Sequence, residues 1–245
     1  MKPDTHASFF RFEHGNHVCV FYRDEEHLLS VLTPYVAEGL RQGERCFCVQ
    51  KPRVAKKLLY DLRFLGIDTD NEIKRGALEL HLAEDVYFQT GKFEPGAMMK
   101  LLEQAIDTSV RRGFTAFRSA GELSWAAKGR QECDQVVGYE KLVEAYYPER
   151  PAIGMCQYPI AEFPADVLQS VLDAHQLSLR EAAPGSRHSS LYVCQGEFRV
   201  EIVADTRTDS SQFDFVVQHR SKGLLGWGAE RAFDAAKARA SALMS

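Results

Sequence analysis

The chain has 245 residues, of which 45% are hydrophobic and 26% charged, and its formal net charge is −4 at pH 7. This hydrophobic content excludes a wholly disordered chain, and the length suffices for one well-buried domain with a small appendage. No stretch reaches the roughly 18 uncharged apolar residues of a membrane span, and the apolar run near the N-terminus is too short for the core of a signal peptide. Neither half has the basic excess of a nucleic-acid binder. We therefore expect a cytoplasmic protein without direct nucleic-acid or membrane contacts.

Strand-like and helix-like segments alternate from residue 17 to about residue 175. The expected strands are 17–22, 45–50, 78–82, 114–119 and 152–158. The expected helices are 24–42, a second from Pro52 up to Gly66, and then 95–112, 132–147 and 165–175. Pro34 is expected to kink the first helix. Short strands separated by helices of this length predict parallel pairing, so the fold class is α/β, with a mainly parallel sheet covered by helices on both faces.

The tail has a different pattern. Residues 182–187 form a turn-rich break, and the strands expected beyond it are 198–203, 213–217 and 223–225. An Ala-rich helix over 229–244 follows, which gives a small C-terminal α+β unit with the order β-β-β-α. The expected division is an N-terminal extension over 1–13, a main domain over 14–180 and this small domain over 185–245.

Ligands of open parallel sheets bind beyond the carboxyl ends of the strands. Polar and aromatic residues gather at these ends. The candidate binding residues there are Tyr22, Arg23, Glu122, Ser124, Trp125, Gln157 and Tyr158. Polar strand ends are also usual wherever chains reach the surface, so each residue has a structural alternative.

The segment 121–126 places a carboxylate, a hydroxyl and an indole within four residues. Glu122 can accept hydrogen bonds from a ligand and Trp125 can wall a pocket; alternatively, Trp125 packs under the next helix and Glu122 caps that helix or pairs with Arg118. Four residues along a strand span about 13 Å, so pairing with Arg118 is strained unless the backbone turns. We therefore expect Glu122 to be solvated or to face a ligand, and both residues to matter for binding more than for folding.

Catalytic, metal and disulfide signals are weak. The six cysteines include no C-x-x-C pair, which favours reduced buried thiols. His17 and Cys19 share one face of a strand but lack the further ligands of a metal site, so a structural role for His17 is expected. No His stands beside Ser119 or Ser124 to form a hydrolase triad. We expect neither a metal nor a cofactor, and no enzymatic activity.

A phosphate-binding loop is also missing. A P-loop requires the pattern G-x-x-x-x-G-K-[ST] after the first strand, because bare backbone N–H groups must approach the phosphates. This chain has Arg23, Asp24, Glu25, Glu26 and His27 instead. Three adjacent carboxylates would repel a nucleoside triphosphate.

Several separated motifs resemble, in order, the MEDS (methanogen/methylotroph DcmR sensory) domain family. They are 17–22 (HVCVFY), 39–46 (GLRQGERC), 121–126 (GELSWA), 139–140 (YE) and 156–158 (CQY), so the resemblance covers roughly residues 14–176. It implies a RecA/KaiC-like core that has lost its P-loop and that senses small organic compounds. Pro159 stands where the family usually has Asp, so a role for that acid is not carried over.

The resemblance implies a signalling protein that binds a small molecule or a partner protein without hydrolysing ATP. The alternative is a scaffold or adaptor that acts through homo-oligomer or partner contacts, without a small ligand. No helix-turn-helix or kinase module is recognised beside the domain, so the output is expected to run through the tail, the surface or a partner. The β-β-β-α order is similar to part of a double-stranded-RNA-binding fold, but Ala229–Phe233 lacks that family's consecutive lysines.

Overall fold

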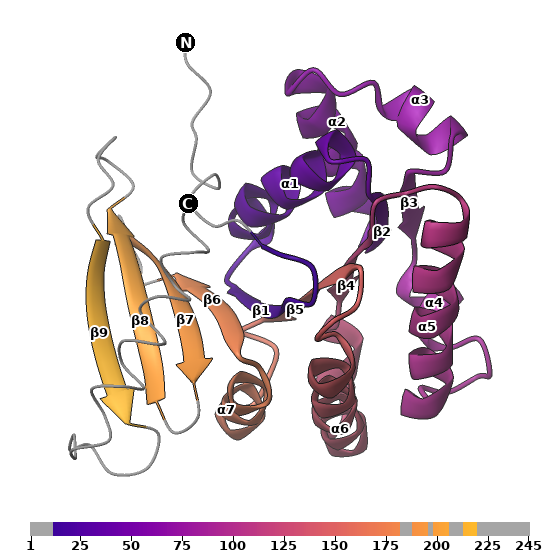
Figure 1. Ribbon diagram of the computed structural model, residues 1–245. Helices are drawn as coiled ribbons and strands as arrows, with labels where there is room; N and C mark the ends of the chain where they lie inside the picture. Colours follow the sequence, from indigo (N-terminus) through magenta and orange to yellow (C-terminus); the bar gives the residue numbers. More distant parts are fainter. Residues whose placement is uncertain (1–11, 182–187, 196–197, 206–212, 220–245) are drawn as a thin grey trace.

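The computed structural model describes residues 12–181, 188–195, 198–205 and 213–219 (Figure 1). Within these residues one sheet has the strand order β3-β2-β4-β5-β1-β6-β7-β8-β9. Its first six strands are β1 (His17–Tyr22), β2 (Arg45–Val49), β3 (Leu78–His81), β4 (Phe117–Glu122), β5 (Ala152–Pro159) and β6 (Leu177–Glu181). The remaining strands are β7 (His188–Gln195), β8 (Phe198–Asp205) and β9 (Phe213–His219).

Helices connect the strands of the first part of the sheet. They are α1 (Glu25–Arg41), α2 (Pro52–Phe64), α3 (Thr69–Lys74), α4 (Ala83–Tyr87), α5 (Pro95–Arg111), η1 (Ser124–Lys128, a 3₁₀ helix), α6 (Arg130–Tyr146) and α7 (Ala165–Ala174). All pairs among β1 to β6 are parallel, whereas β6–β7, β7–β8 and β8–β9 are antiparallel. The predicted mainly parallel α/β fold is confirmed.

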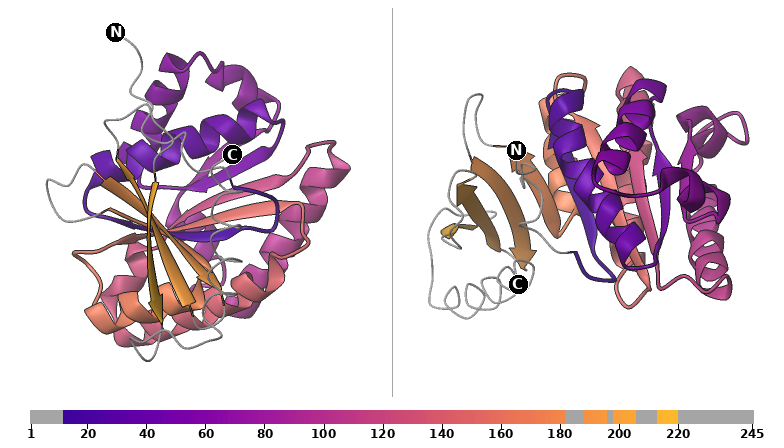
Figure 2. Two further views of the ribbon diagram at one scale, coloured as in Figure 1. Left: turned by 60° about the vertical axis from the view of Figure 1, so that its left-hand side comes forward. Right: turned by 90° about the horizontal axis from the view of Figure 1, so that it is seen from above.

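Two hydrophobic cores flank the sheet. Side chains of α1 and α2 pack on one face, among them Leu32, Val36 and Leu58, all fully buried. The other face is covered by α4, α5, α6 and α7, as Figures 1 and 2 show. Alternating strand residues supply both cores: Val20 faces the first and Phe21 the second. Burial on both faces explains the near-continuous apolar sequence of β1.

Local signals set the helix boundaries. The Asp24 side chain accepts a hydrogen bond from the His27 N–H at 2.8 Å and so caps α1. Pro52 opens α2 at the first helical position, where its missing N–H has no cost. Gly43 follows α1 with φ of 74°, a conformation that favours glycine. The α1 helix continues through Pro34 without ending there.

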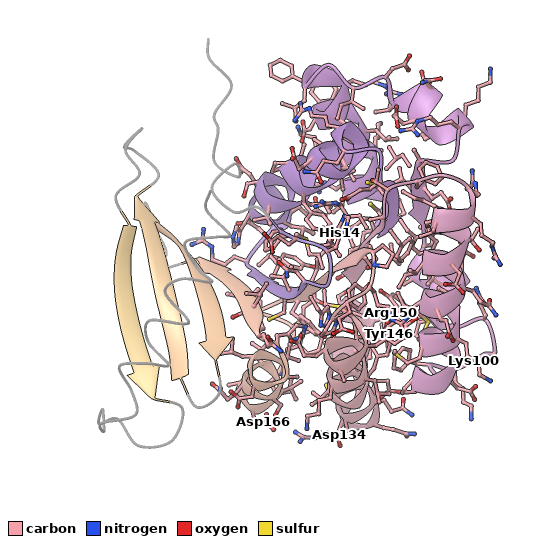
Figure 3. The ribbon with its side chains drawn as sticks, viewed as in Figure 1. His14, Lys100, Asp134, Tyr146, Arg150 and Asp166 are labelled. Carbon is pink, nitrogen blue, oxygen red and sulfur yellow. The ribbon has the colours of Figure 1, made fainter. Side chains whose placement is uncertain are left out.

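One arginine ties two neighbouring helices together at their outer ends. Arg130, the first residue of α6, pairs with Asp134 at 3.1 Å and with Asp166 of α7 at 2.6 Å. Figure 3 labels both aspartates at adjacent ends of the two helices. All three side chains are exposed, so this network contributes little stability.

The structure differs from the sequence-based expectation at several elements. The fourth strand spans Phe117–Glu122 and not 114–119, so Glu122 is its last residue. The elements α3, α4, η1, β6 and β7 were not expected. The reason is that they are short or, for β7, polar at the start, and they carry weak periodicity.

The tail strands continue the main sheet. The strands expected over 198–203 and 213–217 are observed as β8 and β9, whereas 223–225 and 229–244 lie outside the described residues. β7 pairs with β6, and β6 with β1, so β7 to β9 extend the sheet beyond the part that helices cover on both faces. The division into parts at 1–13, 14–180 and 185–245 stays a prediction.

Candidate functional site

The carboxyl edge of the sheet holds a buried carboxylate. Glu122 is only 4% exposed. Its Oε1 accepts hydrogen bonds from the Tyr22 hydroxyl at 3.0 Å and from the Ser124 N–H at 2.9 Å, and its Oε2 accepts from Ser124 Oγ at 3.0 Å. Lys51 Nζ lies 3.7 Å from Oε1. Three of the predicted residues therefore meet around one charged group.

These contacts correct the expectation for Glu122. The carboxylate is buried and therefore not solvated, and Arg118 pairs instead with Glu44, the buried residue directly before β2. Burial, reinforced by the Glu122 carboxylate, raises the pKa of Tyr22 well above its usual value. The Tyr22 phenol therefore stays protonated and donates a hydrogen bond to Glu122.

A pair of amides lies beside this carboxylate. Gln157 stands opposite Glu122 in the β4–β5 register and is fully buried. Gln50 Nε2 donates to Gln157 Oε1 at 2.9 Å. Gln50 Oε1 and Gln157 Nε2 are buried and have no hydrogen-bond partner among the described residues. Unmatched amide atoms of this kind are where a polar group of a ligand could bind.

The remaining predicted residues lie apart from this group. Trp125 packs in the second core, with its ring centroid 4.7–5.1 Å from those of Tyr87, Phe88 and Phe93. Tyr158 also lies in that core, where its hydroxyl donates to Glu140. Arg23 is half-buried at the start of the β1–α1 connection. The predicted residues thus belong to both faces of the sheet: Tyr22 packs in the first core, and Trp125 and Tyr158 pack in the second.

A small cavity lies on the second face of the sheet. It lies between β2, β4 and β5 on one side and α4, α5 and α6 on the other. Apolar side chains such as Phe117, Leu102 and Val143 form most of its wall. Polar groups from His17, Ser119, Tyr147 and Cys156 also line it, with Ser119 Oγ 3.0 Å from the Tyr147 hydroxyl. None of the seven predicted residues belongs to this lining, as far as the described residues go.

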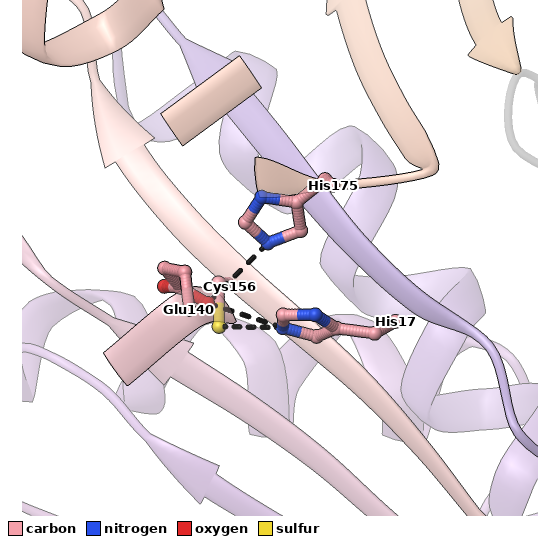
Figure 4. Close-up of side chains that lie close together, drawn as sticks. All are labelled: His17, Glu140, Cys156 and His175. Carbon is pink, nitrogen blue, oxygen red and sulfur yellow. Dashed lines mark hydrogen bonds and ion pairs between the residues drawn. The ribbon is translucent and has the colours of Figure 1, made fainter. Parts of the chain in front are cut away.

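The end of this cavity adjoins a buried polar cluster (Figure 4). His17 begins β1, Cys156 lies in β5, Glu140 in α6, and His175 directly follows α7. His17 Nε2 is 3.3 Å from Cys156 Sγ and 3.2 Å from Glu140 Oε2, and His175 Nε2 is 3.4 Å from the same oxygen. Both histidines and Glu140 have at most 1% exposed side chains.

Glutamates set the protonation of this cluster. Burial lowers the pKa of His17, but hydrogen bonds and charges from Glu140 and Glu144 outweigh it and raise the pKa to about 9. Burial raises the pKa of Glu140, but the two histidines outweigh it and hold the pKa well below its usual value. Burial and then the Glu140 carboxylate raise the pKa of the Cys156 thiol well above its usual range.

Sequence reasoning singled out His17 but missed the rest of this cluster. Its four members come from residues up to 158 positions apart, and only the fold brings them together. The available signal was Glu140, a carboxylate within the apolar stripe of α6 formed by Val136, Tyr139 and Val143. A charged residue on a buried helix face requires a partner.

Comparison with known proteins identifies relatives of this chain. The model of the MEDS family, the MEthanogen/methylotroph, DcmR Sensory domain, matches residues 16–176. The chain is 26% identical over 182 residues to the transcriptional repressor DcmR of Methylorubrum extorquens, which covers 72% of this chain. The match spans 66% of that repressor, slightly less than two thirds of its length.

Comparison with solved structures gives matches at low sequence identity. An uncharacterised protein from Pyrococcus horikoshii, crystallised in complex with an unknown peptide, matches with a TM-score of 0.52 and 11% identity. The match covers 84% of this chain and 94% of that protein. A KaiC-like protein from the same organism matches with a TM-score of 0.45 and 10% identity, over 86% of this chain and 93% of that one.

Proposed function

The chain belongs to the MEDS family of sensory domains, and from this premise we propose that it is a non-catalytic sensory regulator that binds a small organic molecule in the cavity under β2, β4 and β5. The family and the DcmR relative support the sensory or regulatory role. The ligand, its site and the absence of catalysis are the proposed part. A partner protein would receive the signal.

The cavity is the observation that carries the ligand site. Its volume is about 40 Å³. One enclosed water molecule needs roughly 10–15 Å³, so the cavity has room for about three non-hydrogen atoms, each the size of a water molecule. Apolar walls with a few hydroxyl and imidazole groups suit a neutral organic molecule that carries one polar atom. This size and polarity match the small organic compounds that the family resemblance implied.

Two features support the absence of ATP hydrolysis. Only Arg23 and Asp24 separate β1 from α1, which leaves no room for the glycine-rich loop that cradles phosphates. The Asp24 carboxylate also caps the N-terminus of α1, the position that a phosphate takes in P-loop proteins.

Among the described residues, no helix is long and apolar enough to cross a membrane.

The seven residues of the carboxyl edge stay the competing ligand site. Their support is the pair of unmatched amide atoms on Gln50 and Gln157. The argument against them is that the Glu122 carboxylate already accepts hydrogen bonds from Tyr22 and Ser124 within the protein. Variants of the two sites therefore distinguish the two locations.

Methionine methyl groups provide the direct test. Met98 lines the cavity, whereas Met99 packs against the same core without lining it, and the Met155 side chain belongs to the first core on the other face of the sheet. The full chain with ¹³C-labelled methionine methyls is titrated with a panel of neutral one- to four-carbon compounds. We expect saturable shifts at Met98, with Met99 and Met155 little affected.

Two variants locate the binding site. Val143→Phe fills the cavity from α6 and should weaken the binding at least about tenfold, because the ligand volume is lost. Glu122→Gln at the edge should leave the cavity affinity unchanged. The reverse pattern would place the ligand at the edge. No shift with any compound, together with a copurified protein partner, would favour the adaptor function.

A further inference from the structure

Four potential metal ligands converge in the buried cluster of His17, Glu140, Cys156 and His175 (Figure 4). Each offers one donor atom, and all four atoms lie within 4.8 Å of one another. Three of the six separations are 3.2, 3.3 and 3.4 Å. A tetrahedral zinc site with bonds of roughly 2.0–2.3 Å requires ligand atoms about 3.3–3.8 Å apart. The cluster therefore already has nearly the dimensions of such a site.

Charged groups meet at the centre of the cluster. Glu140 Oε2 lies 3.2 Å from His17 Nε2 and 3.4 Å from His175 Nε2, and all three side chains are buried. Buried charges of this kind require partners. Glu140 Oε2 and His175 Nε2 point into the space between the four side chains, where a cation would bind both.

The outward-facing atoms of the ligands are held in place. His17 Nδ1 lies 3.1 Å from Glu144 Oε2, and His175 Nδ1 lies 2.8 Å from the Val171 carbonyl oxygen. With a hydrogen held on each Nδ1, it is Nε2 that would give up its proton and offer an electron pair to a metal at the centre. Glu140 Oε1 accepts from the Tyr158 hydroxyl. Carboxylate and carbonyl partners of this kind orient the histidines of metal sites.

We propose that His17, Glu140, Cys156 and His175 bind one divalent transition metal, with zinc the best fit. Two imidazole nitrogens, one thiolate and one carboxylate form a mixed donor set that zinc prefers over magnesium or calcium, which take oxygen ligands. The thiol would lose its proton on binding. The metal would join β1, β5, α6 and the end of α7, at the end of the cavity that His17 and Cys156 line.

Cobalt substitution in the full chain tests this site. The purified protein is analysed for metal by mass spectrometry, stripped with a chelator and titrated with Co²⁺. We expect one Co²⁺ per chain, the visible absorption of tetrahedral cobalt, and a near-ultraviolet thiolate-to-cobalt charge-transfer band. Zinc should displace the cobalt and abolish both bands. This readout requires no organic ligand, so its failure is separate from failure of the proposed function.

Variants identify the ligands. Cys156→Ser should remove the charge-transfer band, and His175→Gln should weaken zinc binding more than about 100-fold, since even losses outside the ligand shell cost 10–100-fold. Cys133→Ser and His81→Gln are matched controls, because both residues lie outside the cluster, and they should keep wild-type binding. A charge-transfer band that survives in Cys156→Ser overturns the proposal.

The wild-type protein decides the question even if a cluster variant does not fold. Stripped wild-type chain that takes up no stoichiometric Co²⁺, or takes it up without a thiolate band, would show that the cluster is a hydrogen-bonded network without a metal. A zinc-dependent rise in the thermal midpoint of the wild type, absent in His175→Gln, would support the site independently.

Discussion

The contacts of single charged side chains in this fold are set by the pairing of buried charges. Arg118 is 2% exposed, pairs with Glu44 and stacks over the Tyr35 ring, with 4.6 Å from Cζ to the ring centroid. The sequence argument that Arg118 does not reach Glu122 was therefore sound. The expected solvation of Glu122 was wrong, because this residue is buried and Tyr22 and Lys51 reach its carboxylate from other elements. A ligand-facing role of Glu122 stays a prediction. Partners from distant positions are invisible to local spacing.

We predict that Glu122→Gln lowers the thermal midpoint. The new amide NH₂ faces groups that now donate to the carboxylate, and Lys51 loses a counter-ion. Losing charge-assisted hydrogen bonds of this kind costs on the order of 1–3 kcal/mol, which for a chain of this size is a drop of roughly 3–10 °C. Differential scanning calorimetry measures it.

Tyr22→Phe is the matched control for this prediction. It removes one donor and leaves the carboxylate with Ser124 and Lys51, so its effect should be smaller. The double variant should lose less stability than the sum of the two single variants, because they share a hydrogen bond. An unchanged midpoint for Glu122→Gln would mean that the carboxylate is not needed for folding and would restore it as a candidate for binding.

At the scale of elements, periodicity predicted the long segments and missed the short ones. The apolar stripes of five helices predicted their ends to within a few residues; these helices are α1, α2, α5, α6 and α7. β4 was displaced by three residues because its end, Ser119 to Glu122, has small and polar residues that do not look like a strand. Gly121 is small for a reason: a Cβ there would lie 2.4 Å from the Tyr87 hydroxyl. A single sequence does not show that close approach.

The buried cluster was still less accessible to sequence reasoning. His17 and Cys156 meet because β1 and β5 pair in parallel, and Cys19 is opposite Cys156 in that register. His175 joins them only because α7 ends where it does. The strand order places β5 between β4 and β1, and periodicity does not predict strand order.

We predict that the β1–α1 connection neither binds nor hydrolyses ATP. The Asp24 carboxylate occupies the N-terminus of α1, and Glu25 and Glu26 add negative charge in the first turn. A triphosphate would meet repulsion where a P-loop offers N–H groups. Isothermal titration with MgATP should show no binding, and phosphate release should stay at the level of the buffer.

A contaminating ATPase is the main source of error in that assay. Arg23→Ala and Asp24→Asn serve as controls, because an activity of this chain would change with them and a contaminant's would not. Magnesium-dependent turnover that disappears in these variants would contradict the prediction and assign the connection a catalytic role.

At the scale of the whole molecule, the sheet has two parts with different surroundings. Helices cover both faces from β3 to β1, whereas β7, β8 and β9 continue the sheet by antiparallel pairing (Figure 2). The two described hydrophobic cores draw their buried residues from positions 18 to 177. The backbone pairing of β6 with β7 joins the second part to the first.

We predict that limited trypsin cuts the chain first after Arg187. Arg187 follows the turn-rich Pro184–Ser186 sequence, whereas Arg180 lies in β6, paired with Phe21 on one side and with Ser190 on the other. Proteolysis needs local opening, which backbone pairing on both sides opposes. Mass spectrometry should therefore find a fragment 1–187 before one ending at Arg180, and Arg187→Gln should slow the cut. The separately expressed fragment should unfold cooperatively, because both cores lie within it. A first cut after Arg180, or aggregation of 1–187 under conditions that keep the full chain soluble, would mean that the tail strands are needed for the fold of the main domain.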